Sequence, residues 1–348
     1  MGGVAEYAAL LAAGLAAAGR DVHVLCPDSP QPVRAQFTVH PELGDFSPAR
    51  LRRCGELLDQ SPAPRYIQLQ WVPHGYGRRA MNIEFCRWIR ERVRRHGDLL
   101  DLMVHEPGYE LFRSWKTAVP AIVHRAMLRI LLDAARCVRV STTAWIARLQ
   151  PLTTRALPFE WAPIPSLVPA AAAPDAVSRI RARYGSPLTG YFGPYHEPYA
   201  SLLAPVLERL PGPVLLIGRG GDRFAGPSSR VAATGSLPLA DLSCHIAACD
   251  VMLHLYPDGV DTRRSTAMAS LAHGRALVTT EGRFTESVWR ESGAVMLVPP
   301  GHPDAAAAAV IRLLEDEPER LRLGEAARRL HAGRFDIVHT VRSICESS

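Results

Sequence analysis

The sequence has little lysine, and its positive charge is not concentrated. Lys116 is the single lysine among 40 basic residues, so arginine carries nearly all of the positive charge. The net charge is only +6, and the arginines are spread along the chain, which is typical of solvated surface. We therefore expect no nucleic-acid partner.

Paired cysteines, metal-ligand clusters and long apolar runs are also missing. The seven cysteines are never spaced as Cys-x-x-Cys, which argues against a zinc ribbon or a disulfide framework. No group of His, Asp or Glu has metal-ligand spacing, so we expect no metal site. No apolar run approaches the roughly 20 residues of a membrane span, and the first residues lack the basic start of a secretory signal. We expect a soluble cytoplasmic protein.

Short apolar segments alternate with helical segments along the whole chain. Residues 66–71 and 99–104 have the pattern of strands, and this alternation predicts an α/β fold with parallel sheets. Five prolines fall within residues 158–174, where they stiffen the chain and prevent sheet pairing. We therefore predict two Rossmann-like domains, residues 1–165 and 166–348. Whether the last helix packs back on the first domain stays open.

Candidate ligand-binding residues follow the predicted strands, because ligands of open parallel sheets bind beyond the carboxyl ends of the strands. Gly2 and Gly3 directly precede the first predicted helix, where bare backbone can approach a phosphate or sugar oxygen. His105 ends the predicted strand 99–104, and Glu106 follows it. An ordinary helix cap and a satisfied strand-end histidine remain open as alternatives.

The segment 256–266 is the richest in candidate residues, and it leads from a strand into a helix. It holds Arg263 and Arg264, followed by the N-cap residue types Ser265 and Thr266. Two guanidinium groups beside free helix N–H groups would make an anion site. The alternative is a capped helix that carries two solvated arginines.

Other strand ends supply glycine and aromatic groups. Gly218-Arg219-Gly220 follows a strand but lacks the third glycine of the dinucleotide fingerprint, so NAD binding is not indicated. The rings of Trp71, His74 and Tyr76 are suited to the faces of a sugar, although Trp71 can equally belong to the core.

An arginine-rich segment, residues 87–95, has the pattern of an amphipathic helix. Contact with the anionic inner surface of a membrane and a plain exposed helix both stay open.

The order of these features resembles the GT-B glycosyltransferases, in particular the large retaining family 4 (glycosyl transferases group 1). The resemblance covers nearly the whole chain and is best in the second half, at Gly190-Tyr191-Phe192-Gly193 and from His273 to Thr280. It implies two Rossmann-like domains that face a central cleft, with a nucleotide sugar on the second domain and an acceptor on the first. It also implies transfer with retention of configuration. Oriented donor groups in a dry cleft can neutralise the leaving diphosphate without a metal, so we expect a metal-independent enzyme. We expect a UDP- or GDP-sugar as co-substrate and no other cofactor.

The resemblance also assigns roles by position. Gly2-Gly3 looks like the family's glycine loop, and His105 looks like its strand-end histidine, which contacts the transferred sugar. Asp261 stands at the first of the family's two glutamates, whereas Ala269 stands at the second. The segment 193–200 lacks the family's phosphate-binding Arg and Lys, and the strand that normally precedes the glycine loop is absent from this sequence.

We therefore predict a substitute anion site. The predicted donor-binding residues are Gly2, Gly3, Gly193, Gly218, Arg219, Arg263, Arg264, Ser265 and Thr266. The predicted catalytic residues are His105, Glu106 and Asp261, and the predicted acceptor-binding residues are Trp71, His74 and Tyr76.

The sequence thus predicts a glycosyltransferase that moves a sugar to a glycan, a lipid-linked glycan or a secondary metabolite. Two alternatives stay open: an enzyme similar to sugar-nucleotide epimerases, and a catalytically altered protein that only binds or scaffolds sugar nucleotides. The sequence gives no signal for an oligomer.

Overall fold

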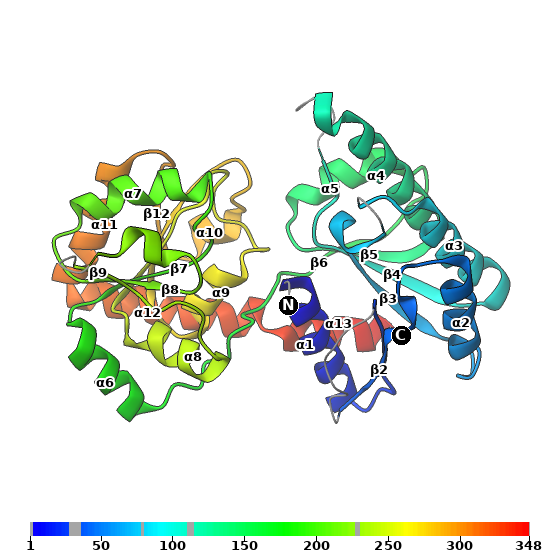
Figure 1. Cartoon of the computed structure of the whole chain (residues 1–348), viewed down its shortest axis with the longest axis horizontal. Coiled ribbons are helices and arrows are strands. Elements are labelled where there is room, and N and C mark those ends of the chain that lie inside the picture. The colour runs from blue at the N-terminus through cyan, green and yellow to red at the C-terminus, as the bar shows by residue number, and fades with distance from the viewer. Residues whose placement is uncertain (1–2, 28–35, 78–79, 110–114, 227–229, 348) are drawn as a thin grey trace. The chain divides into compact units, whose positions relative to one another are not determined.

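The chain folds into two compact units of the α/β class. The computed structural model describes residues 3–27, 36–77, 80–109, 115–226 and 230–347. Unit 1 consists of Met1–Pro163 with Ile337–Ser348, and unit 2 consists of Ile164–Asp336. Each unit has its own parallel sheet (Figure 1). The prediction of parallel α/β sheets is confirmed.

The main sheet of unit 1 has four parallel strands in the order β3-β4-β5-β6. Trp71 lies opposite Val104, and Val104 lies opposite Val140, so three of these strands end side by side. The predicted strands 66–71 and 99–104 are confirmed as β3 and β4. The bounds are β3 (Tyr66–Trp71), β4 (Leu99–Val104), β5 (Ala135–Val140) and β6 (Phe159–Trp161).

A second, smaller sheet of unit 1 pairs β1 (His23–Leu25) with β2 (Thr38–His40) in parallel. Within the described ranges, β1 pairs with β2 alone and β3 pairs with β4 alone, so the two sheets stay separate.

Helix ends in unit 1 follow from local sequence, as α3 illustrates. The Asn82 side chain accepts a hydrogen bond from the Phe85 N–H at the start of α3, and Gly97 ends the helix with a φ of 70°. The buried Arg92 donates to Asp98 at 2.7 Å, which ties α3 to the start of β4. The helices of unit 1 are α1 (Gly3–Ala17), α2 (Pro48–Leu58), α3 (Ile83–His96), α4 (Trp115–Ala134), α5 (Ala144–Leu149) and α13 (Ile337–Ser347).

Buried charges attach the C-terminal helix α13 to the sheet of unit 1. Arg139 on β5 donates to Asp101 on β4 at 2.8 Å and lies 2.9 Å from the carboxylate of Glu160 on β6. Ser343 of α13 donates to Glu160 at 2.9 Å. Helix α13 also packs against α1. These partners compensate the cost of burying the Arg139 and Asp101 charges.

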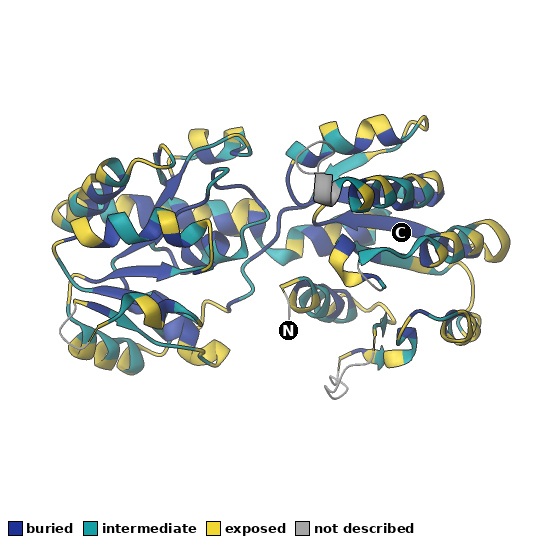
Figure 2. Ribbon diagram, turned by 45° about the horizontal axis from the view of Figure 1, so that its top comes forward, coloured by how far each residue is buried: buried dark blue, intermediate teal, exposed yellow. Residues whose placement is uncertain are grey.

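Unit 2 contains a six-stranded parallel sheet in the order β12-β11-β10-β7-β8-β9. Figure 2 shows these strands mostly as buried and the outward faces of the helices as exposed. The near-continuous apolar runs of β8 and β10 are typical of parallel strands covered on both faces. The bounds are β7 (Thr189–Phe192), β8 (Val214–Ile217), β9 (Val231–Ala233), β10 (Val251–His254), β11 (Ala276–Thr280) and β12 (Met296–Val298).

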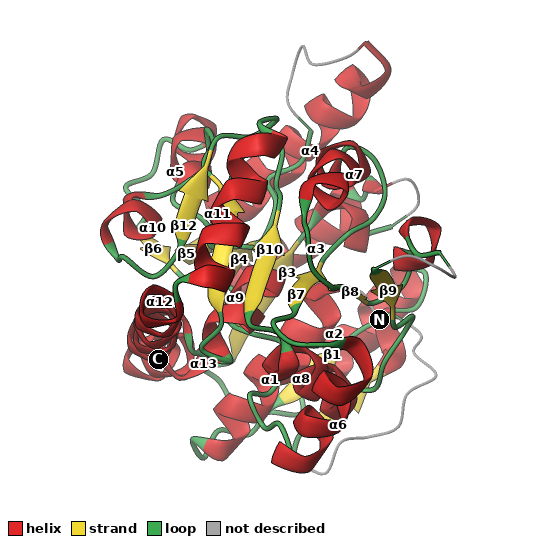
Figure 3. Ribbon diagram, turned by 90° about the vertical axis from the view of Figure 1, so that its left-hand side faces the viewer, coloured by secondary structure: helices red, strands yellow, loops and turns green. Residues whose placement is uncertain are grey.

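Helices cover both faces of this sheet, and α11 crosses β10, β11 and β12 (Figure 3). None of the described helices combines the length and the apolar composition that a bilayer span requires. The helices of unit 2 are α6 (Pro174–Tyr184), α7 (Tyr199–Arg209), α8 (Leu239–Ala248), α9 (Ser265–Ala272), α10 (Ser287–Glu291), α11 (Pro303–Glu315) and α12 (Glu317–Leu330).

The strand order of unit 2 reverses between β7 and β10. The chain runs from β7 to β8 and β9 on one side, and then starts again at β10 on the other side of β7. The loops that follow β7 and β10 therefore border the position where ligands of open α/β sheets bind.

Candidate functional site

His105 follows the end of β4 in unit 1 and is held by three neighbouring elements. Its N–H donates to the Trp71 carbonyl of β3 at 3.0 Å. Its carbonyl accepts hydrogen bonds from the Ser141 hydroxyl after β5, at 3.0 Å, and from the Trp145 indole of α5, at 2.9 Å. The position of this residue is therefore fixed by the sheet itself.

The imidazole ring of His105 is buried, neutral and oriented. Its Nε2 lies 3.0 Å from Oε1 of Gln70, and the Tyr7 ring packs edge-on against it with centroids 4.9 Å apart. Burial lowers the pKa of His105 to about 4, because the low-dielectric interior disfavours the charged ring. At neutral pH the ring therefore has one donor and one acceptor nitrogen and suits binding of a hydroxyl.

Three other predicted site residues of unit 1 are Gly2, Gly3 and Glu106. Glu106 is exposed directly after His105, whereas Gly3 is the first residue of α1. Gly2 lies outside the described residues.

Trp71 and Tyr76 belong to an aromatic stack in the core of unit 1. The Trp71 side chain is fully buried and stacks on Tyr76 at 5.5 Å between ring centroids. Tyr76 in turn stacks on Phe85 of α3 at 5.0 Å. Both predicted acceptor-binding rings thus have their faces covered, and their placement does not support direct contact with a ligand.

An exposed aromatic group lies beside that core. His74 is exposed and contacts the edge of Tyr109, which is 40% exposed and stacks on His124 of α4 at 5.6 Å. Gly108 makes the stack possible, because a Cβ at this residue would lie 2.7 Å from Nδ1 of His124. Tyr109 and His124 were missed by the sequence analysis, since their contact joins a loop to a distant helix.

In unit 2, Asp261 is the buried centre of the segment after β10. Its side chain is fully buried and accepts hydrogen bonds from the Arg263 side chain at 2.9 Å and from the Arg263 backbone N–H at 3.1 Å. Nε of Arg264 lies 3.6 Å from the same carboxylate. Two guanidinium groups thus share one carboxylate.

Arg264 is also enclosed by aromatic groups. Its guanidinium lies 4.6 Å from the ring centroid of Tyr256 and donates to the Tyr199 hydroxyl at 3.1 Å. Burial opposes the charge of Arg264, but the Asp261 carboxylate with its other partners outweighs it and raises the arginine's pKa. Arg264 therefore stays charged although its side chain is only 17% exposed.

Helix α9 begins directly after these arginines, with Ser265 as its first residue. No side-chain hydrogen bond caps this start, and the hydroxyl of Thr266 pairs with that of Tyr256 at 2.8 Å. Ala269, at the position of the family's second glutamate, is fully buried within α9.

Glu286 anchors the same segment and was not found by the sequence analysis. Thr262 donates to it through its hydroxyl at 2.6 Å and through its backbone N–H, and the Trp289 indole donates to it at 3.0 Å. No local motif marks Glu286, because its partner lies 24 residues away in the chain.

Gly193, Gly218 and Arg219 lie at the ends of β7 and β8. Gly193 follows β7, and a Cβ there would lie 3.2 Å from the Tyr191 hydroxyl. Gly218 has a φ of 103°, and its N–H donates to the Thr234 hydroxyl at 3.1 Å. Arg219 is exposed after β8, on the side of β7 that faces away from β10 in the strand order. The structure thus groups Arg263 and Arg264 but not Arg219 with Asp261.

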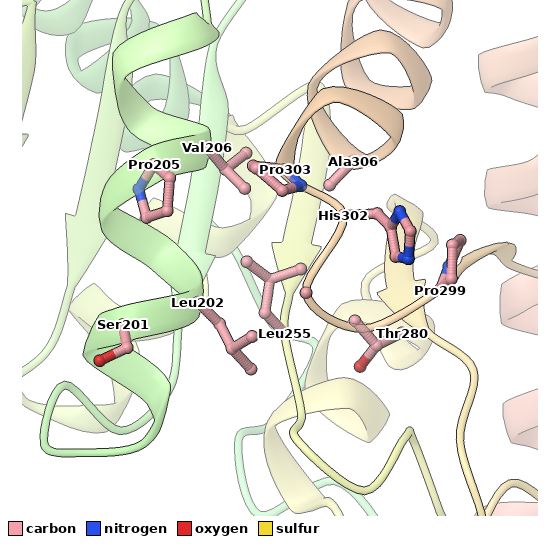
Figure 4. A pocket seen from close by; sticks show the side chains of 11 residues that line it. Ser201, Leu202, Pro205, Val206, Leu255, Thr280, Pro299, His302, Pro303 and Ala306 are labelled. Atoms are coloured by element: carbon pink, nitrogen blue, oxygen red, sulfur yellow. The ribbon is translucent and has the colours of Figure 1, made fainter.

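A small pocket opens near the ends of β10, β11 and β12, between α7 and α11 (Figure 4). Its volume, measured as the space open to water molecules, is about 50 Å³. This holds a few water molecules but is too small for a nucleotide sugar. Among the described residues, no three His, Cys, Asp or Glu side chains are grouped as metal ligands would be.

No sequence-family profile matches the chain, and no curated protein matches it. Solved structures match over its full length. HepE of Anabaena, in complex with UDP, has a TM-score of 0.71 at 16% identity, with 99% of this chain and 96% of HepE covered. Sucrose-phosphate synthase of Thermosynechococcus elongatus has a TM-score of 0.73 at 18% identity, with 99% of this chain and 93% of the synthase covered.

WaaG, a glycosyltransferase of lipopolysaccharide biosynthesis, has a TM-score of 0.65 at 16% identity, with coverage of 99% and 96%. These likenesses, together with the four-stranded and the six-stranded parallel sheets, show that the chain has the GT-B fold. The predicted resemblance is confirmed at the level of the fold.

Proposed function

We propose that the chain is a glycosyltransferase that takes a sugar from a nucleotide sugar and transfers it, with retention of configuration, to a hydroxyl of an acceptor. The observation that carries this proposal is the group of Arg263 and Arg264 around the buried Asp261. It lies after β10, next to the reversal of strand order, and at the start of α9.

The two guanidinium groups suit the leaving group of the reaction. When the bond from the sugar to the diphosphate breaks, negative charge develops on the phosphate oxygens. Positive groups that are already oriented in a sheltered site stabilise that charge without reorganising. Guanidinium groups are also well shaped to bind phosphate through two parallel hydrogen bonds. The chain's own groups can thus stabilise the leaving diphosphate, and we propose that no metal is required.

The donor is a UDP-hexose in this proposal, with a GDP-sugar as the second candidate. Its support is that HepE, which has the same fold, is described in complex with UDP-glucose. We assign the diphosphate to Arg263, Arg264 and the start of α9, with the buried Asp261 orienting both guanidinium groups.

Unit 1 supplies the groups for the sugar and the acceptor. The neutral His105 ring accepts a hydrogen bond from a hydroxyl of the transferred sugar. Glu106, exposed beside it, orients the acceptor hydroxyl or takes its proton. His74 and Tyr109 offer exposed ring faces to a glycan or small-molecule acceptor.

The proposal also places the protein at the inner surface of the cell membrane. Val119 and Ile122 on α4 are 65% and 59% exposed. On the neighbouring α3, the side chains of Arg87 and Arg94 are 58% and 61% exposed, and they pair with Glu84 and Asp133 at the surface. Apolar and basic groups on adjoining helices suit an anionic lipid surface.

The decisive experiment is a panel of UDP- and GDP-sugars incubated with the protein, in which release of nucleoside diphosphate and identity of the sugar are followed. A transferase releases the diphosphate slowly without an acceptor and faster with one. An isomerised donor would indicate the epimerase alternative. Binding without turnover would indicate the scaffold alternative, which the buried Ala269 in place of a carboxylate favours.

A further inference from the structure

The side chain of Gln70 on β3 has a defined orientation toward His105. Its Oε1 lies 3.0 Å from Nε2 of His105, and its Nε2 lies 3.4 Å from the Gln68 carbonyl. An amide oxygen can only accept and an amide NH₂ can only donate, so the hydrogen-bond partners fix which end faces the imidazole. The imidazole nitrogen that faces Gln70 must therefore carry the hydrogen.

The surroundings hold both partners of this hydrogen bond in place. The Gln70 carbonyl accepts a hydrogen bond from the buried Tyr76 hydroxyl at 2.5 Å, and Gln70 pairs with Met103 of β4 in the sheet. The Tyr7 ring packs against the imidazole at an interplanar angle of 80°. Rotation of the imidazole is thus restricted, and its hydrogen bond to Gln70 selects the tautomer.

We propose that Gln70 is a positioning residue that keeps the proton of His105 on Nε2, so that Nδ1 presents a lone pair to a hydroxyl of the bound sugar. This inference rests on the proposed function for the identity of the ligand. In the part of the chain that the structure describes, Nδ1 of His105 has no hydrogen-bond partner of its own. A histidine in the other tautomer would present an N–H there and could not accept the same hydrogen bond.

Two substitutions separate positioning from plain packing. Gln70→Met keeps the size of the side chain but removes the acceptor, so the imidazole loses the partner that selects its tautomer. Gln70→Glu keeps an acceptor and adds a negative charge. The matched control is Gln60→Glu, the same chemical change at an exposed residue of unit 1.

The tautomer is measured directly, by long-range ¹H–¹⁵N NMR of protein labelled at histidine. In the wild type, His105 is expected to be the Nε2–H tautomer from pH 5.5 to 8. In Gln70→Met, His105 is expected to be a mixture of both tautomers. In Gln70→Glu the opposite charge raises the pKa of His105 toward neutrality, so the imidazolium is expected near pH 6. Two other titratable groups lie near this ring. Tyr7 contacts the His105 ring, and Glu106 follows His105 in the chain.

Kinetics with the nucleotide sugar that is turned over provide the second readout. Gln70→Met is expected to lower kcat/KM about tenfold at every pH, as for loss of one buried hydrogen bond. Gln70→Glu is expected to stay near wild type at pH 8 and to lose activity progressively toward pH 6, because Nδ1 then becomes a donor. Gln60→Glu is expected to follow the wild-type profile.

An Nδ1–H tautomer in the wild type overturns the inference, as does an unchanged tautomer in folded Gln70→Met. If Gln70→Met does not fold, the wild-type tautomer and the pH profile of Gln70→Glu decide the matter. If the NMR results are as expected but no nucleotide sugar is turned over, the proposed function fails while the hold of Gln70 on the tautomer is confirmed.

Discussion

Asp261 orients the two arginines of the proposed donor site. It is buried and lies within 3.6 Å of each guanidinium group. A buried carboxylate with two arginine partners is a defined structure, whereas two unpaired arginines would be mobile.

Replacing Arg263 and Arg264 together with alanine is expected to weaken UDP binding severely. Hydrogen bonds to charged groups contribute about 1.5–3 kcal/mol each, so the double variant should lose at least a hundredfold in affinity. Calorimetric titration with UDP provides the measurement. Arg179→Ala, at an exposed residue of α6, serves as the control and should bind UDP like the wild type. Equal affinities in all three proteins would remove the arginines from the donor site.

At the scale of elements, the segment between β10 and α9 depends on a close approach to the segment after β11. Gly259 has a φ of 86°, and a Cβ there would lie 2.2 Å from the Gly282 nitrogen. Glu286 fixes the same pair of segments through Thr262. The position of the arginines therefore depends on two segments that are distant in the sequence.

The substitution Gly259→Ala should destabilise unit 2 by about 3 kcal/mol, because the new Cβ meets backbone that cannot move aside. It should also weaken UDP binding, since the neighbouring arginine segment must shift. Gly212→Ala is the matched control, because its Cβ would meet nothing within 4 Å. Thermal unfolding and UDP titration of both variants test the prediction, and equal behaviour of the two would contradict it.

The α3–α4 surface of unit 1 gives a second prediction at this scale. The double variant Val119→Ser with Ile122→Ser should bind vesicles containing anionic lipid more weakly than the wild type, because less apolar surface enters the interface. Co-sedimentation with anionic and with neutral vesicles measures this. Leu321→Ser, at a 63% exposed leucine of unit 2, is the control. No binding of the wild type to anionic vesicles would contradict the membrane contact.

Local pattern predicted the elements better than it predicted the site. The strand β3 follows from its alternating apolar and polar residues, and β4 follows from apolar residues interrupted only by Asp101. Arg263 and Arg264 are near Asp261 in the chain itself. The Trp71 ring stacks on Tyr76, which in turn stacks on Phe85 of α3. Sequence alone could not show this stack, so it left the burial of Trp71 open. The anchor from Thr262 to Glu286 was not predictable, since no periodicity relates the two residues.

At the scale of the whole molecule, each unit carries a buried histidine that gains a proton at a much lower pH in the folded protein than in the unfolded chain. Burial lowers the pKa of His254 in unit 2 to about 3, while that of His105 in unit 1 falls to about 4. Unfolded histidine has a pKa of about 6.5. The unfolded chain thus binds more protons below that pH, and stability falls as the pH is lowered from about 6.5 toward the folded pKa.

Unit 2 offers a clean test of this pH dependence, because Trp289 is its single tryptophan and is buried. ¹⁹F NMR of protein labelled with 5-fluorotryptophan follows its unfolding in urea separately from that of unit 1. Between pH 6.5 and 4.5 the free energy of unfolding of unit 2 should fall by about 2–3 kcal/mol through His254 alone.

His254→Gln should remove that share of the pH dependence, even if the variant is less stable at neutral pH after losing the imidazole's hydrogen bond to Ser270. His302→Gln, at an exposed histidine, should keep the full dependence. The comparison rests on slopes and not on absolute stability, so packing losses cancel. A His254→Gln slope equal to that of the wild type would mean that His254 gains a proton within the folded unit.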